Sequence, residues 1–218
     1  MGSNLNLNYQ IEEYINSHSI KLHPVQYEII KYNETLGEIK KMQISISQCH
    51  FLHFIIKIIK PKNILEIGTF TGLSALTMGL AMDENSKLTA LDKNKETSDV
   101  AMSFFKKAKI DSKINLLINN AIVSLKDLYN KKKQFDFIFI DADKENYINY
   151  FNNSLNILNN NGIIVVDNVL WYGDVADQNK NDRLTLKIRE FNKFIKDDNR
   201  VESLILPIGD GLSVCRKK

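Results

Sequence analysis

Short hydrophobic runs alternate with longer amphipathic runs along most of the chain. The hydrophobic runs have strand length and lie at residues 64–67, 87–91, 114–118, 135–140 and 163–166. The segments between them have helical length and lie at residues 73–82, 95–109, 122–130 and 147–158. Strands that alternate with helices predict a parallel sheet covered by helices on both faces. The runs at 135–140 and 163–166 are nearly all apolar, which indicates central strands buried on both sides.

The start of the chain has helical spacing instead. Residues 7–40 follow this pattern, with Pro24 suited to a first helical turn. We therefore expect an N-terminal helical extension over residues 1–40, which would cap the active site or a partner subunit. Next, we expect Ser47 to cap an apolar helix at 48–60 that ends before a proline.

The end of the chain predicts a hairpin. A helix at 184–196 precedes strands at 201–206 and 212–216, and the glycine-rich link between the strands is too short for a crossover. Five strands from the alternation and two from the hairpin make a seven-stranded sheet. The predicted fold is α/β, a Rossmann-like, doubly wound and mostly parallel sheet whose last strand is antiparallel. Residues 41–218 would form its single domain.

Composition excludes several classes of protein. The 218 residues are 44% hydrophobic and 25% charged with a net charge of +3, which is typical of a folded domain and not of a disordered chain. The longest apolar run, near 51–59, is interrupted by His53 and Lys57, so we expect no membrane span. The first ten residues lack the pattern of a secretory signal, which favours the cytoplasm. Cys49 and Cys215 are far apart and lack metal-site spacing, so we expect plain buried thiols.

Polar residues follow the strands at the edge where open parallel sheets bind ligands. The first strand runs into Glu66 and a loop bounded by Gly68 and Gly72, where a tight turn would expose the N–H groups of the next helix. The loop lacks the third glycine of a dinucleotide site, and the acidic residue before it would repel a pyrophosphate. Asp92 ends the second strand, where a carboxylate can accept both hydroxyls of a ribose.

Two central strands end in a cluster of oxygen ligands. Asp141 follows one strand, and Asp167 and Asn168 follow the next. Oxygen donors without histidine or cysteine favour Mg²⁺ over Ca²⁺ or Mn²⁺. The alternative is that these carboxylates only cap helices, but without a cation they would repel one another.

Four motifs together resemble one enzyme family. They are EIGTFTGLS at 66–74, DADK at 141–144, DNVLW at 167–171 and GDG at 209–211. Their order and spacing resemble the class I, S-adenosylmethionine-dependent O-methyltransferases of the caffeoyl-CoA and catechol type. The resemblance extends from about residue 42 to residue 216.

The resemblance implies a set of site residues. The cofactor S-adenosylmethionine would be held by Ile44, Glu66, Gly68, Thr69, Ser74, Asp92, Ala121 and Asp143. A divalent metal, Mg²⁺ before Ca²⁺ or Mn²⁺, would be held by Asp141, Asp167 and Asn168. Lys144, beside Asp141, would be the catalytic base, and Trp171 would line the acceptor pocket. Relatives of this type form homodimers, so we expect a homodimer here.

The expected reaction is methylation of a catechol-like or caffeoyl-type small phenol. A sulfonium methyl group is already activated, so the enzyme mainly has to place an oxyanion in line with it. A bound metal would lower the pKa of the hydroxyl, and Lys144 could take the proton or stabilise the phenolate. The segment from 172 to 183 is shorter than the insertion loop with which plant enzymes of this type grip a coenzyme A thioester. This favours a bacterial-type enzyme with small substrates.

Some residues depart from the family pattern. Asn120 stands where an acidic residue is usual, so the adenine contact can differ. Cys49 and His50 replace a usual Gly-Gln pair, and His50 could either touch a ligand or be structural.

Two other functions are alternatives. One is methylation of a hydroxyuridine in transfer RNA, supported by the lysines at 131–133 and a basic tail. The weaker one is an NAD-dependent oxidoreductase, against which the glycine spacing and Glu66 argue.

Overall fold

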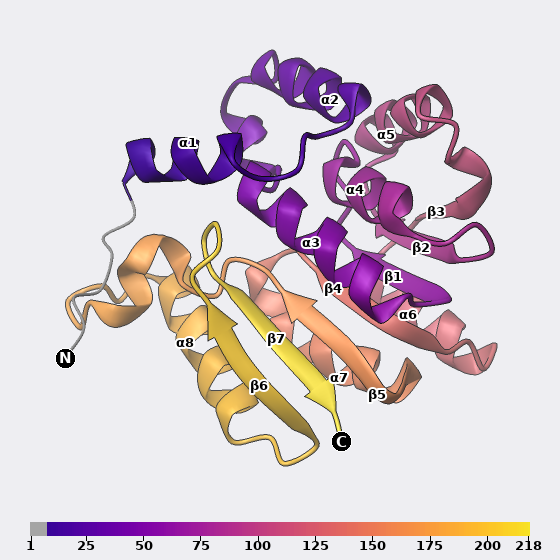
Figure 1. Ribbon diagram of the computed structural model, residues 1–218. Coiled ribbons are helices and arrows are strands. Elements are labelled where there is room, and N and C mark those ends of the chain that lie inside the picture. Colours follow the sequence, from indigo (N-terminus) through magenta and orange to yellow (C-terminus); the bar gives the residue numbers. More distant parts are fainter. Residues whose placement is uncertain (1–7) are drawn as a thin grey trace.

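The computed structural model describes residues 8–218, and in it one mixed sheet lies between two layers of helices (Figure 1). The strands are β1 (Asn63–Ile67), β2 (Lys87–Asp92), β3 (Ile114–Ile118), β4 (Phe135–Ile140), β5 (Leu158–Val166), β6 (Val201–Leu206) and β7 (Leu212–Lys217). They form a seven-stranded sheet in the order β3-β2-β1-β4-β5-β7-β6. The first five strands are parallel, whereas β7 is antiparallel to both of its neighbours. The predicted doubly wound sheet is confirmed.

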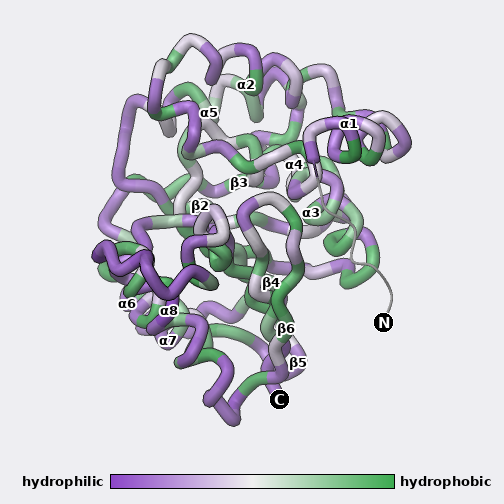
Figure 2. The backbone as a smooth tube through the Cα atoms, turned by 90° about the vertical axis from the view of Figure 1, so that its left-hand side faces the viewer, coloured by the Kyte–Doolittle hydropathy of each residue, from purple (hydrophilic) through white to green (hydrophobic). Residues whose placement is uncertain are grey.

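Each face of the sheet has its own hydrophobic core. One core is built with α2 (Pro24–Glu34), α3 (Ile46–Ile59), α4 (Leu73–Ala81) and α5 (Lys95–Lys107). The other is built with α6 (Ala121–Asn130), α7 (Tyr147–Ile157) and α8 (Arg183–Lys196). From Phe137 to Ile140 the side chains of β4 point alternately into the two cores, because neighbouring residues of a strand face opposite sides. Figure 2 accordingly shows hydrophobic colour along β4 in the middle of the molecule.

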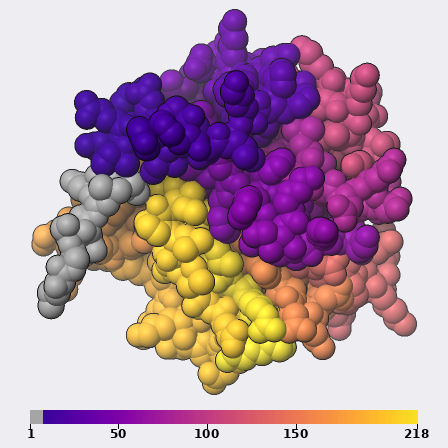
Figure 3. All heavy atoms as spheres, in the orientation of Figure 1, coloured from indigo at the N-terminus to yellow at the C-terminus, as the bar shows by residue number. Residues whose placement is uncertain are grey.

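The N-terminal region has two α-helices and a short 3₁₀ helix. Helix α1 (Tyr9–Ser17) buries none of its residues, whereas Val25 and Ile29 of α2 belong to the core under α3 and α4. The 3₁₀ helix η1 (Gly37–Met42) follows. In the space-filling view the indigo N-terminal segment covers one end of the molecule and meets the yellow C-terminal segment (Figure 3). The expected start of the extension, residues 1–7, lies outside the described residues.

Helix α3 begins earlier than predicted. Ser45, not Ser47, is the N-cap: its hydroxyl accepts the N–H of Gln48 at 3.2 Å, and the Gln48 side chain accepts the N–H of Ser45 at 2.7 Å. The prediction was wrong because only Ser45 has a glutamine three residues later, as a capping box requires. The hydroxyl of Ser47 instead donates to Asn16 of α1.

Strand β5 is also longer than predicted. It begins at Leu158, directly after α7, and its pairing with β4 shifts register between Phe135 and Phe137. Residues 158–162 were not predicted as part of the strand, because three of them are asparagines and asparagine disfavours strands.

One helical stretch, Gly37–Ile59, is long and apolar enough to cross a membrane by length and composition. Its backbone is extended at Gln43 and Ser45, and Leu52 and Ile56 of its α3 part are buried in the core. Core helices of soluble proteins pass the same test, so we assign no membrane span to it.

Candidate active site

The strand register places four of the predicted residues in one row across the sheet edge. Ile67 of β1 pairs with Leu91 of β2 and with Ile140 of β4, which in turn pairs with Val166 of β5. The residues that follow these four are Gly68, Asp92, Asp141 and Asp167. The row crosses the boundary between β1 and β4, where the order of the strands reverses, and ligands bind at this place in doubly wound sheets.

The loop after β1 can be built only with glycine at its first position. Gly68 has φ +90°, and a Cβ there would overlap the backbone carbonyl of Asp141. Gly72 has φ +91° and precedes α4 without a side-chain cap. The first N–H groups of α4 therefore have no capping side chain, which is typical of helix N-termini that bind ligands.

Asp92 fixes the shape of this loop. One carboxylate oxygen accepts the N–H groups of Thr69 at 3.0 Å and Phe70 at 2.7 Å. The other accepts the N–H of Asn94 at 2.8 Å. The side chain is partly exposed, and the oxygen that accepts only the Asn94 N–H keeps a lone pair for a ligand hydroxyl.

Glu66 is a buried carboxylate without a partner. Its exposed fraction is 0%, and neither oxygen has a hydrogen-bond partner among residues 8–218. Desolvation raises the pKa of Glu66 to about 8, although the nearby Ser74 and Thr69 hydroxyls lower it in part. A buried polar group without a partner is costly, so this carboxyl group is suited to a ligand that brings a donor or a positive charge.

On the other side of the row, Lys144 holds two side chains together. It begins the short 3₁₀ helix η3 (Lys144–Asn146), and its ammonium donates to Asp141 at 3.0 Å and to Asn168 at 2.7 Å. Burial would lower the pKa of Lys144, but Tyr147 and the Asp141 charge outweigh it and raise the pKa above its usual value. The lysine is therefore a cation here, 5.1 Å from the centre of the Tyr147 ring.

Asp167 is only 2% exposed and is held from several directions. One carboxylate oxygen accepts the side-chain N–H of Gln48 at 2.6 Å and the backbone N–H of Asn168 at 2.6 Å. Its backbone carbonyl accepts the hydroxyl of Tyr147 at 2.9 Å. Burial and the charge of Asp141 raise the pKa of Asp167 well above its usual value, against the opposing effect of Lys144.

Comparison with known proteins identifies the family. The family model for O-methyltransferases matches residues 16–218. The chain belongs to the O-methyltransferase family. It is an S-adenosylmethionine-dependent O-methyltransferase, and the weighed alternative of an NAD-dependent oxidoreductase was wrong.

Individual relatives cover nearly the whole chain. It is 39% identical over 214 residues to Probable caffeoyl-CoA O-methyltransferase 2 of Dictyostelium discoideum, which covers 97% of this chain and 90% of that protein. The O-methyltransferase from Bacillus cereus, solved in complex with SAH, has a TM-score of 0.87 at 28% identity and covers 96% of this chain and 97% of that one. The SAH-bound methyltransferase PaMTH1 of Podospora anserina has a TM-score of 0.90 at 27% identity, with 100% of both chains covered.

The donor set of this O-methyltransferase fits a hard cation. Asp141, Asp167 and Asn168 offer carboxylate and amide oxygens, and Lys144 already donates to two of these side chains. Burial and the charge of Asp141 make ionisation of Asp167 costly, and the Lys144 cation offsets part of that cost. The three side chains contribute two carboxylates and one amide, and residues 8–218 contain no group of three or more His, Cys, Asp or Glu side chains arranged to hold a metal.

The remaining predicted cofactor residues lie around the row. Ile44 is buried directly before the cap of α3, and Ala121 is the first residue of α6. The cap of α6 is Asn120, whose side chain accepts two N–H groups of the first turn. Asp143 is exposed, and its two oxygens accept the hydroxyl of Tyr150 and the amide of Asn146, each at 2.5 Å.

The loop after β5 is clamped by the link between β6 and β7. Asp210 accepts the backbone N–H of Tyr172 at 2.5 Å, and its other oxygen lies 3.4 Å from the Asn168 side-chain nitrogen. Trp171 and Tyr172 both have positive φ, 49° and 55°. Trp171 begins the 3₁₀ helix η4 (Trp171–Ala176), is partly buried, and packs against the core under α7 and α8.

The two departures near α3 lie at a buried position, Cys49, and a partly buried position, His50, whose Nδ1 has no hydrogen-bond partner among residues 8–218. Cys49 is fully buried, which raises the pKa of its thiol to about 12 and makes it unreactive. Burial lowers the pKa of His50, which lies near the backbone of Ile20, in the segment between α1 and α2. The residue that sequence analysis missed is Gln48, and the capping-box spacing from Ser45 was the signal that could have found it.

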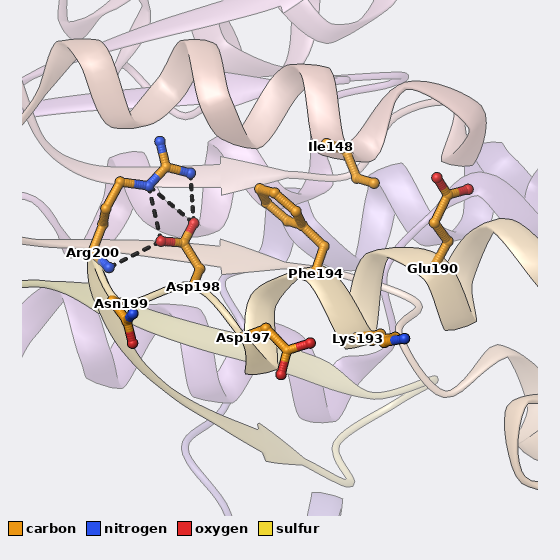
Figure 4. Close-up of a pocket in the computed structure, with 8 residues that line it drawn as sticks. All are labelled: Ile148, Glu190, Lys193, Phe194, Asp197, Asp198, Asn199 and Arg200. Atoms are coloured by element: carbon orange, nitrogen blue, oxygen red, sulfur yellow. Dashed lines mark hydrogen bonds and ion pairs between the residues drawn. The ribbon is translucent and has the colours of Figure 1, made fainter.

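One pocket, with a cavity volume of about 530 Å³, lies away from the strand-end row. It lies between Ile148 of α7 and the C-terminal end of α8, and Figure 4 shows Asp198 paired with Arg200 at one side of it. None of the predicted site residues lines this pocket. We therefore assign no catalytic role to it.

Proposed function

We propose that the enzyme methylates a hydroxyl group of a catechol-like or caffeoyl-type small phenol with the help of Mg²⁺. The observation that carries the proposal is the Lys144 ammonium bound to Asp141 and Asn168 beside the buried Asp167. Positive charge and oxygen donors thus meet at one end of the row. A phenolate needs this environment. The part of the row formed by Gly68 and Asp92, where we expect the cofactor, lies directly beside it.

The cofactor is proposed to lie over the loop after β1. Glu66 would pair with its ammonium group, and Asp92 would accept the ribose hydroxyls. Gly68, Thr69 and Ser74 would contact the methionine part, and Ile44, Ala121 and Asp143 would complete the site. The unpartnered oxygens of Glu66 support this placement, because a cationic ligand would satisfy them.

The acceptor is proposed to lie between Lys144 and Trp171. The Lys144 ammonium stabilises the phenolate, whose oxygen forms a bond to the methyl carbon as the bond to sulfur breaks. Because Lys144 is already protonated, it can take the phenol proton only after releasing its own, so we assign it first the role of stabilising the phenolate. A divalent cation held by Asp141, Asp167 and Asn168 would supply a lower hydroxyl pKa and a fixed orientation for vicinal hydroxyls. The catechol in a caffeoyl group has such hydroxyls, and the Dictyostelium relative bears that substrate in its name.

The test is methyl transfer from labelled S-adenosylmethionine. Catechol, a caffeate ester, a phenol with one hydroxyl and unmodified transfer RNA are offered with Mg²⁺ and with EDTA. We expect labelling of the catechol and the caffeate ester that EDTA abolishes. Labelling of the single-hydroxyl phenol in EDTA would contradict the proposed metal dependence, and labelling of RNA alone would replace the acceptor class with the hydroxyuridine alternative.

We also propose that the enzyme is a cytoplasmic homodimer. Phe54 and Ile58 of α3 are 64% and 62% exposed, and Leu204 on the edge strand β6 is 52% exposed. A second copy covering these side chains would remove apolar surface and a free strand edge from water. Cys49 and Cys215 are free thiols, which suits a reducing compartment. Light scattering should give about twice the 25.1 kDa of one chain. A mass of one chain would contradict the dimer.

A further inference from the structure

Gln48 joins three parts of the chain at the base of the site. It lies in the first turn of α3 and is 3% exposed. On one side is the extended segment that leads into α3, and on the other is the end of β5. The link between β6 and β7 approaches from a third direction, as the yellow loop near the start of α3 shows (Figure 1).

Both ends of its amide group are used. The oxygen accepts the backbone N–H of Ser45 at 2.7 Å, and the nitrogen donates to the Asp167 carboxylate at 2.6 Å. A backbone N–H can only donate and an ionised carboxylate can only accept, so these two partners fix which way the amide points. Gly209 leaves the room for it, because a Cβ there would lie 2.5 Å from the amide carbon of Gln48.

We propose that Gln48 is a positioning residue that couples cofactor binding to cation binding. This inference rests on the proposed function, in which Ile44 contacts the cofactor and Asp167 holds the cation. Ser45 directly follows Ile44, so a cofactor that orders this segment also fixes the Gln48 oxygen. The nitrogen of the same amide then holds one oxygen of Asp167 and leaves the other free. Water cannot take over this bridge, because the amide is buried.

The chain contains a matched control. Gln26 is 4% exposed and occupies the same third position in the capping box of α2. Its oxygen accepts the N–H of His23 at 2.8 Å, and its nitrogen donates to the hydroxyl of Thr77 at 2.7 Å. The two glutamines therefore share burial, capping and bond lengths, and they differ in that only Gln48 reaches a predicted cation ligand.

The experiment measures Mn²⁺ affinity of the full chain by calorimetry, with and without saturating SAH. We expect the wild type to bind Mn²⁺ at least about fivefold more tightly when SAH is present. In Gln48→Met, which keeps the size but neither hydrogen bond, the ratio of the two dissociation constants should fall below about twofold. Gln26→Met should keep the wild-type ratio. Thermal unfolding confirms that each variant is folded.

Gln48→Glu separates the bridge from the helix cap. Its carboxylate still accepts the N–H of Ser45 but cannot donate to Asp167. We expect the ratio of its Mn²⁺ dissociation constants without and with SAH to fall as in Gln48→Met. A wild-type ratio in either folded Gln48 variant, or SAH and Mn²⁺ binding independently in the wild type, would overturn the inference alone. Failure of the wild type to bind SAH would instead contradict the proposed cofactor site.

Discussion

The two halves of the strand-end row satisfy their buried charges in opposite ways. In the cofactor half, Glu66 is fully buried and its oxygens have no partner among the described residues. In the other half, which we call the lysine cluster (Asp141, Lys144, Asp167 and Asn168), the chain supplies its own partners. Burial keeps a proton on Glu66 until a ligand brings a partner for its carboxylate, whereas the lysine cluster is held in place before any ligand arrives.

The difference matches the ligand that each half is proposed to bind. A cofactor that carries a fixed positive charge can complete the charge balance of Glu66 each time it binds. An acceptor hydroxyl is neutral until it loses its proton, so the protein must place positive charge there beforehand. The following predictions test this contrast, beginning with the largest expected effect.

Replacing Lys144 should damage catalysis and spare cofactor binding. Lys144→Met removes the ammonium between Asp141 and Asn168, and kcat should fall by about 10²–10⁴. The dissociation constant of SAH should remain near its wild-type value, because the lysine belongs to the other half. Methyl transfer and calorimetry measure the two quantities.

The control is Lys187, which forms an i,i+3 pair with Glu190 on the exposed face of α8, as Lys144 does with Asp141. Lys187→Met should leave kcat unchanged. Equal losses of activity and of SAH affinity in Lys144→Met would mean that the two halves are not separate.

Gly68 is the point where the halves touch, so a side chain there should disturb both. The added Cβ of Gly68→Ala would overlap the Asp141 carbonyl, and the free energy of unfolding should fall by about 3 kcal/mol or more. Gly37 also has positive φ, but a Cβ there meets nothing within 4 Å. Gly37→Ala should therefore cost only about 1 kcal/mol. Urea unfolding measures both, and similar losses would show that the close approach at Gly68 is unimportant.

Glu66→Gln should weaken cofactor binding without preventing folding. The amide keeps the size of the side chain but loses the charge that would pair with the cofactor ammonium. We expect the SAH dissociation constant to rise about 10- to 100-fold. Asp136→Asn is the control, since this carboxylate holds the N–H groups of Lys62 and Asn63 at the opposite edge. Unchanged SAH affinity in Glu66→Gln would remove Glu66 from the cofactor site.

The same carboxyl group should make stability depend on pH. Its pKa is about 8 in the folded chain, above the ordinary value of 4.5, so the folded state holds a proton that the unfolded state releases. The stabilisation is fully present below pH 4.5 and is lost as the pH rises toward 8. Without cofactor, the wild type should lose about 1.4 kcal/mol per pH unit relative to Glu66→Gln between pH 5 and 8. Urea unfolding along this series tests it, and a constant difference would show that Glu66 is already ionised.

The sequence predicted the frame of the site better than its internal contacts. Strand ends can be located from hydrophobic runs, and parallel strands bring their ends to one edge, so the row of Gly68, Asp92, Asp141 and Asp167 was foreseeable. The pairing of Lys144 with Asn168 was not, because it depends on how η3 turns after β4. The Gln48 contact spans 119 positions and could not be read from any local pattern.

The error at Ser47 had a local remedy. The stretch from 44 to 47 offers two serines that helix propensity does not separate, but only Ser45 has a glutamine three residues later. The Gln48 oxygen accepts the N–H of Ser45 while its nitrogen donates to Asp167. A prediction that weighed the spacing of the capping box would have chosen correctly.

The smallest expected effect concerns this cap. Ser45→Ala removes the oxygen that accepts the Gln48 N–H, and the free energy of unfolding should fall by about 1 kcal/mol. Ser47→Ala removes only a partly buried hydrogen bond to Asn16, so it should cost less. Urea unfolding of the two variants compares them directly. A larger loss of unfolding free energy in Ser47→Ala would show that Ser47 is the N-cap. Because Ser45→Ala keeps the backbone N–H that Gln48 accepts, its SAH-dependent Mn²⁺ affinity should stay that of the wild type. A loss of this dependence would mean that the lysine cluster relies on the cap itself, and that it is less firmly held before ligands arrive than its hydrogen bonds indicate.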